Sequence, residues 1–128
     1  MAEYDPGVCN IGPAEQRKRY ILGGSGFAAA VLFILYGNLL PYQIVTHILL
    51  FTSLLAGFEG IYQGYLGFCA GFALQRVYDV SQSGDGRHRV EDEEAHRQDM
   101  QKAWRIHGYS FASSMLLTGF FILLRIPG

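Results

Sequence analysis

Residues 20–75 read YILGGSGFAAAVLFILYGNLLPYQIVTHILLFTSLLAGFEGIYQGYLGFCAGFALQ and contain a single formal charge, Glu59. A second stretch without formal charge lies between Arg105 and Arg125. About 20 apolar helical residues span the roughly 30 Å hydrocarbon core of a bilayer. A soluble protein of 14.3 kDa has too small a core to bury so much continuous apolar sequence. The sequence therefore predicts an all-α integral membrane protein that crosses the bilayer several times.

The charge balance and the cysteine count exclude several other classes of protein. Ten Lys/Arg against eleven Asp/Glu give a net charge of −1, whereas a nucleic-acid-binding protein needs a basic face. Two cysteines are too few for a disulfide scaffold or a four-cysteine zinc site. The first 13 residues are partly acidic and hold no apolar core, so they do not predict a cleaved signal peptide.

We expect three transmembrane helices, over residues 20–40, 42–62 and 106–124. The glycine-rich residues 63–78 are expected at the membrane surface. Residues 79–105 are expected to form a polar loop and then a cytoplasmic amphipathic helix, acidic at its start and basic at its end, as the helix dipole favours. Residues 1–128 are then one membrane domain.

An alternative with four transmembrane helices places a hairpin turn at Gly57–Gly60. The distribution of Lys and Arg separates the two topologies, because cytoplasmic loops collect these residues. Three spans put nine of them on one side and only Arg125 on the other, whereas four spans give six against four. We therefore favour three spans, with the N-terminus and residues 79–105 in the cytoplasm.

Glycines recur at steps of three and four in the second half of the long apolar stretch, on one helical face. Such a stripe of small residues lets a second membrane helix approach closely. The alternative is a loose interfacial segment that happens to be rich in glycine. The candidate helix-packing residues are Gly57, Gly60, Gly64, Gly67 and Gly71.

Two segments resemble a family of small prokaryotic integral membrane proteins to which no function is attached. They are CNIGPAE at Cys9–Glu15 and FCAGF at Phe68–Phe72, which follows Gln63. Asp99, Lys102-Ala103 and Ile106 add to the resemblance. It implies no catalytic or binding residue, but it draws attention to the two segments that contain cysteine.

Cys9 and Cys69 are the first candidates for chemistry. At the cytoplasmic mouth of the helices they could form a redox pair or supply two ligands to a soft metal. The alternative is that Cys69 is a small apolar residue among glycines and Cys9 a loop residue, since a buried free cysteine behaves as a small hydrophobe. The reducing cytosol also disfavours a stable disulfide.

Three polar residues of the second span are further candidates: His47, Glu59 and Gln63. A carboxylate deep in the membrane is costly and is then usually functional, whereas at the interface it is ordinary. A lone histidine in a span is more often an interhelical hydrogen-bond partner than a ligand. Together the three could line a pathway through an oligomer.

The sequence contains no G-x-S-x-G, P-loop or H-E-x-x-H pattern, so we expect neither a cofactor nor an enzyme. We expect a non-enzymatic structural, assembly or accessory subunit, whose partners are the lipid bilayer and either other membrane subunits or further copies of itself. The alternatives are a small homo-oligomeric channel or transporter, and a membrane thiol or metal protein that uses Cys9 and Cys69.

Overall fold

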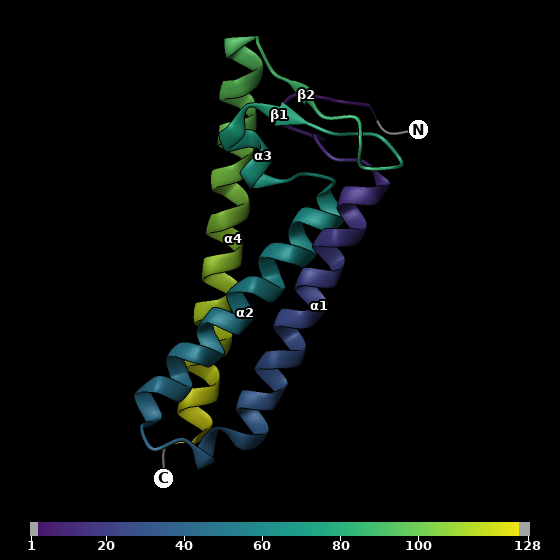
Figure 1. Cartoon of the computed structure of the whole chain (residues 1–128). Helices are drawn as coiled ribbons and strands as arrows, with labels where there is room; N and C mark the ends of the chain where they lie inside the picture. Colours follow the sequence, from purple (N-terminus) through teal and green to yellow (C-terminus); the bar gives the residue numbers. More distant parts are fainter. Residues whose placement is uncertain (1–2, 126–128) are drawn as a thin grey trace.

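The computed structural model describes residues 3–125 and is mostly helical (Figure 1). Three of its helices are long and apolar enough to cross a membrane, in agreement with the predicted three spans and with a multi-pass membrane protein. In chain order the elements are α1 (Pro13–Tyr36), the 3-10 helix η1 (Gly37–Leu39), α2 (Gln43–Leu66), α3 (Ala70–Gln75), β1 (Val77–Tyr78), β2 (His88–Arg89) and α4 (Glu93–Arg125).

Helix α2 runs without interruption through Glu59, so the hairpin turn of the four-span alternative is wrong. The glycines on either side of Glu59 let α1 pack closely: a Cβ on Gly57 would meet the Phe27 ring, and a Cβ on Gly60 would meet the backbone of Gly23. The helix ends beyond the predicted residue 62, at Leu66. There Gly67 adopts φ of +65°, the left-handed conformation that commonly closes a helix.

The segment predicted to lie at the membrane surface, residues 63–78, is not one element. It contains the last turn of α2, the short helix α3 and strand β1. Strand β1 pairs with β2 in antiparallel register, Val77 opposite Arg89 and Tyr78 opposite His88.

Helix α4 contains two elements that the sequence analysis predicted as separate helices. The amphipathic helix within residues 79–105 and the span over 106–124 are one continuous helix of 33 residues. No proline interrupts it, and a helix of that length measures about 50 Å. Figure 1 shows its N-terminal part rising beyond the ends of α1 and α2, beside α3 and the two strands.

The three long helices form an open layer with α2 in the middle. Helix α1 packs along one flank of α2, and α4 packs along the other (Figure 1). At the end of the layer near η1, the buried residues Ala30, Leu50 and Leu54 form a small core, against which Phe121 of α4 packs.

At the other end lies a region that we call the cap: residues 3–12, residues 67–92 and the N-terminal turns of α4. Two adjoining clusters form its core. One contains Phe68, Ala70, Ala73, Ala103 and Ile106, and the other contains Ile11, Cys69 and Phe72. The cap therefore ties α3 and the N-terminal segment to α4.

Candidate functional site

A hydrogen-bonded pair joins the middle candidate span, α2, to the flanking helix α4 at the polar end of the layer. His107 Nδ1 of α4 lies 2.6 Å from Glu59 Oε1 of α2. Gln63 Nε2 donates to Glu59 Oε2 at 2.7 Å, and Gln63 Oε1 accepts from the backbone N–H of Ala70 at 3.3 Å. The carboxylate thus orients the imidazole, and the amide connects the carboxylate to the start of α3.

This site lies close to the level at which the sequence predicts lipid headgroups. Gly60 is packed against the backbone of Arg19 and Gly23, so its neighbour Glu59 lies near the basic end of α1. On α4 the pair is preceded by Trp104, whose side chain is 69% exposed, and aromatic rings of this kind favour the membrane interface. These neighbours favour the interfacial alternative for Glu59, which stays a prediction.

A cleft of about 380 Å³ lies between α3 and α4, beside this pair. Its walls are apolar apart from His107. They consist of Ala70, Gly71 and Leu74 from α3, and Met100, Ala103 and Trp104 from α4. A mainly apolar cavity with a small number of oriented polar groups is the usual form of a small-molecule site.

Of the three polar candidates on α2, the structure brings together Glu59 and Gln63 but not His47. His47 is 12 residues before Glu59 on the same helix, which corresponds to about 18 Å. His107, the first titratable residue of the second charge-poor stretch, is the partner that the sequence analysis missed. The sequence did contain a signal for this pair, because a lone carboxylate and a lone imidazole in charge-poor stretches near a membrane each require a polar partner.

The candidate helix-packing glycines fall into two groups. Gly57, Gly60 and Gly64 face α1, where a Cβ on Gly60 would overlap the backbone nitrogen of Gly23 and lie 2.6 Å from the carbonyl oxygen of Arg19. A Cβ on Gly64 would meet the Tyr20 ring at 3.1 Å. Gly67 ends α2, and Gly71 is exposed on α3 beside the cleft. The left-handed turn at Gly67 separates the two groups.

The two segments that contain cysteine meet, and Asn10 makes the contact. Asn10 is fully buried; its Nδ2 donates to the carbonyl of Cys69 at 3.0 Å, and its Oδ1 accepts from the Cys69 N–H at 2.7 Å. Both thiols are free. Cys69 is buried, and the half-buried Cys9 donates its S–H to the carbonyl of Ile11.

Burial raises the pKa of the Cys9 thiol above its ordinary value of 9.0, and the nearby charge of Asp5 raises this pKa further, although the hydrogen bond to Ile11 opposes the change. We expect iodoacetamide to alkylate Cys9 slowly at pH 7.5, with the rate still rising beyond pH 9, since only the thiolate reacts. The substitution Asp5→Asn should lower this pKa and speed the reaction. Peptide mass spectrometry measures both, and a rate that levels off below pH 8 would contradict the expectation.

Buried polar groups hold the cap together, and the sequence analysis did not single them out for this role. Asp99 is buried in α4, where it accepts from the Tyr4 hydroxyl at 2.7 Å and from the N–H of Gly7 at 2.8 Å. Burial and the carboxylate of Asp99 raise the pKa of the Tyr4 phenol. Asp79 is buried as well; its backbone pairs with Asn10 and Gly12, and its Oδ1 accepts from Ser81.

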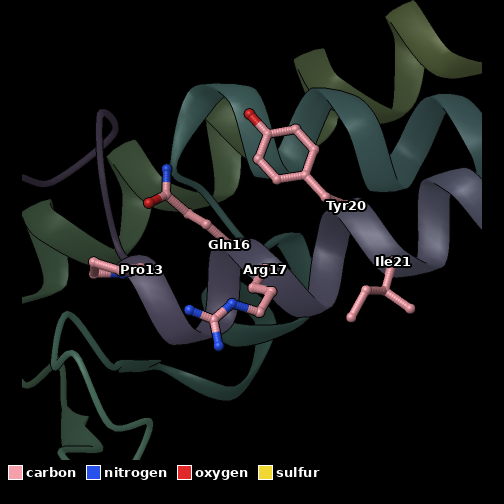
Figure 2. A pocket seen from close by; sticks show the side chains of 5 residues that line it. All are labelled: Pro13, Gln16, Arg17, Tyr20 and Ile21. Carbon is pink, nitrogen blue, oxygen red and sulfur yellow. The ribbon is translucent and has the colours of Figure 1, made fainter.

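A second hollow lies on the outer surface of α1, where Figure 2 shows the side chains of Pro13, Gln16, Arg17, Tyr20 and Ile21. Its space of about 480 Å³ lies along a single helix rather than between two. Gln16 Nε2 already donates a hydrogen bond to the carbonyl of Gly64, at 3.0 Å, and is not left for a ligand. We therefore regard the cleft beside Glu59 and His107 as the better candidate site.

Among residues 3–125, no group of three or more His, Cys, Asp or Glu side chains is placed to hold a metal ion. The chain matches no known family model, no curated protein and no solved structure.

Proposed function

We propose that this chain is a non-enzymatic structural or assembly subunit of a membrane complex. The observation that carries the proposal is the openness of the helical layer. Only 22–28% of the apolar window of each candidate span is buried within the chain. Because α2 lies between α1 and α4, most of the surface of the two flanking helices is left for lipid or for other helices.

A groove on this open layer supports a docking role. At the end away from the cap, side chains of all three helices enclose about 240 Å³ of almost wholly apolar space. Its walls are formed by Ile34, Leu50, Leu54, Leu117, Phe120, Phe121 and Leu124. Helices associate in membranes through close packing rather than through hydrophobicity, so a shaped groove favours a partner helix over loosely ordered lipid.

The cap supports the same proposal, since its polar groups are used to fix the helix ends. Asn10 joins the N-terminal segment to α3, and Asp99 joins it to α4. Glu15, buried in the first turn of α1, pairs with Lys18 at 2.8 Å and with Arg19 at 3.4 Å. A membrane protein whose helix ends are fixed by buried hydrogen bonds and ion pairs suits a subunit that positions its neighbours.

The two alternative functions have less support. For a homo-oligomeric channel, Glu59 and Gln63 supply a polar cluster, but the distance along α2 to His47 leaves no continuous polar lining. For a thiol or metal protein, the burial of Cys69 and the raised pKa of Cys9 both oppose thiolate chemistry.

The docking proposal predicts a difference between two adjacent positions on α4. A photo-crosslinking amino acid at Leu117, which lines the groove, should give one discrete protein adduct in intact cells, whereas Leu116, which is 74% exposed outside the groove, should not. Native mass spectrometry from a mild detergent should then show a hetero-complex. A closed homo-oligomer would favour the channel, and a monomer crosslinked only to lipid would overturn the docking role.

We also propose that the cap lies in the cytoplasm. Nine Lys and Arg residues lie at the end of the layer that bears the cap, and only Arg125 lies at the other end. Because cytoplasmic segments collect Lys and Arg, this distribution supports the orientation. A membrane-impermeant maleimide applied to sealed cells should leave Ser83→Cys unlabelled, and rapid labelling would reverse the orientation.

A further inference from the structure

We propose that the cleft between α3 and α4 binds a membrane-soluble amphiphile: one apolar chain or ring that carries a neutral hydroxyl or carbonyl group, hydrogen-bonded to His107 Nε2. The proposal does not depend on the docking role, because this cleft and the groove lie at opposite ends of the helical layer.

The size and lining of the cleft define the apolar part of the ligand. Its 380 Å³ lies at the small end of the range of about 300–1,000 Å³ that is usual for ligand sites. The exposed Leu74 and Trp104 form its rim, and the buried Ala70 and Ala103 form its floor. Such a space accepts one chain or one ring but not a complete two-chain lipid.

The imidazole defines the polar part of the ligand. Glu59 engages Nδ1, so Nε2 is the nitrogen left for a ligand, and none of the described residues provides it with a hydrogen bond. The side chain of His107 is 48% exposed and that of Glu59 only 16%, so the imidazole screens the carboxylate from the ligand. A hydroxyl can donate to Nε2 in the neutral ring, and a carbonyl can accept from it in the protonated ring.

The carboxylate also indicates which ligands the cleft rejects. In the neutral ring Nε2 offers only a lone pair, so a carboxylate has no hydrogen bond to make there, and it also meets the negative charge of Glu59 on the far side of the ring. A simple alkane would leave the imidazole nitrogen without a partner next to an apolar ligand, which costs binding free energy. A neutral oxygen group avoids both penalties.

Trp104 provides the measurement, since it is the only tryptophan of the chain and it lines the cleft. Bromine quenches tryptophan fluorescence on contact, so we would titrate the protein in nanodiscs with four bromo-alkyl probes of matched length. These are 11-bromoundecanol, methyl 11-bromoundecanoate, 11-bromoundecanoate and 1-bromoundecane. The alcohol, the ester or both should quench in a saturable manner, and the preference between them identifies the hydroxyl or the carbonyl as the natural group.

The carboxylate and the bromoalkane should give only the unsaturable quenching that results from partition into lipid. Saturable quenching by 1-bromoundecane equal to that of the alcohol would overturn the role of His107. Linear quenching by all four probes would overturn the site.

Variants separate binding from folding. Gly71→Leu fills the cleft with little strain, because a Cβ there meets only the Cys69 sulfur, at 3.8 Å, and it should abolish saturable quenching. Gly24→Leu, in open space on α1, is the matched control and should change nothing. His107→Phe should weaken binding of the preferred probe by roughly three- to tenfold, the value of one neutral hydrogen bond.

Glu59→Gln tests the electrostatic part of the proposal. The amide can still accept from His107 Nδ1, but the negative charge is gone, so 11-bromoundecanoate should quench more strongly than with the unchanged protein. It should stay weaker than the alcohol, because a carboxylate has no hydrogen to donate to Nε2. Unchanged quenching by 11-bromoundecanoate would contradict the proposed rejection of anions by Glu59.

Discussion

Replacing Gly60 by alanine is expected to lower the free energy of unfolding by about 2–3 kcal/mol. The added Cβ would overlap the backbone nitrogen of Gly23 and lie 2.6 Å from the carbonyl oxygen of Arg19. Backbone atoms of a helix cannot rotate away as a flexible side chain can, so α1 and α2 must move apart along their whole interface. Thermal unfolding in detergent, followed by circular dichroism, measures the loss.

The matched control is Gly24→Ala, one residue beyond Gly23 on α1. A Cβ on Gly24 meets no atom within 4 Å. Alanine is favoured over glycine within a helix by about 1 kcal/mol, so this variant should be neutral or slightly more stable. The two substitutions make the same chemical change, and only the one at Gly60 should lower the stability. Equal effects would show that α1 and α2 do not approach closely at Gly60.

Replacing Asn10 by alanine should cost about 1–3 kcal/mol, the cost of one unpaired buried polar group. The variant leaves the buried N–H of Cys69 without its partner, whereas the C=O of Cys69 still accepts from the N–H of Ala73 at 3.1 Å. The contact between the N-terminal segment and the start of α3 is then weaker, although the backbone N–H groups of Asn10 and Ile11 still donate to Gly67. Because Cys69 is buried, its reaction with a small maleimide should become fast and thus report the local opening.

Gln101→Ala is the control for this variant, because Gln101 is an exposed amide in the cap. Substitutions at such surface positions usually change the stability by less than about 0.5 kcal/mol. Unchanged stability and a still unreactive Cys69 in the Asn10 variant would show that the paired hydrogen bonds do not hold the cap.

The sequence by itself determined the mainly helical fold and the three helices that are long and apolar enough to span a membrane. The absence of charge over residues 20–75, apart from Glu59, and between Arg105 and Arg125 was sufficient for that, because the length of an apolar run and the thickness of a bilayer are fixed quantities. The gap between the predicted spans 20–40 and 42–62 lies in the break between α1 and α2, where Pro41 disfavours a helix at the residue before it.

The ends of the helices were predicted less well, because tertiary contacts decide them. Residues 63–66 continue α2 because Gly64 packs against the Tyr20 ring of α1. The predicted amphipathic helix and the predicted third span form one helix, α4, because Ala103 and Ile106 at their junction lie in the core of the cap. Neither contact has a local signal in the sequence.

Only the tertiary structure decided which residues form the site. Glu59 and His107 are 48 positions apart, and Asn10 and Cys69 are 59 apart. Periodicity and composition describe one helix at a time and carry no information on which helix lies beside it. The pairing of Glu59 with His107 follows from how α4 packs against α2, and the hydrogen bonds of Asn10 follow from how the N-terminal segment folds back over α3.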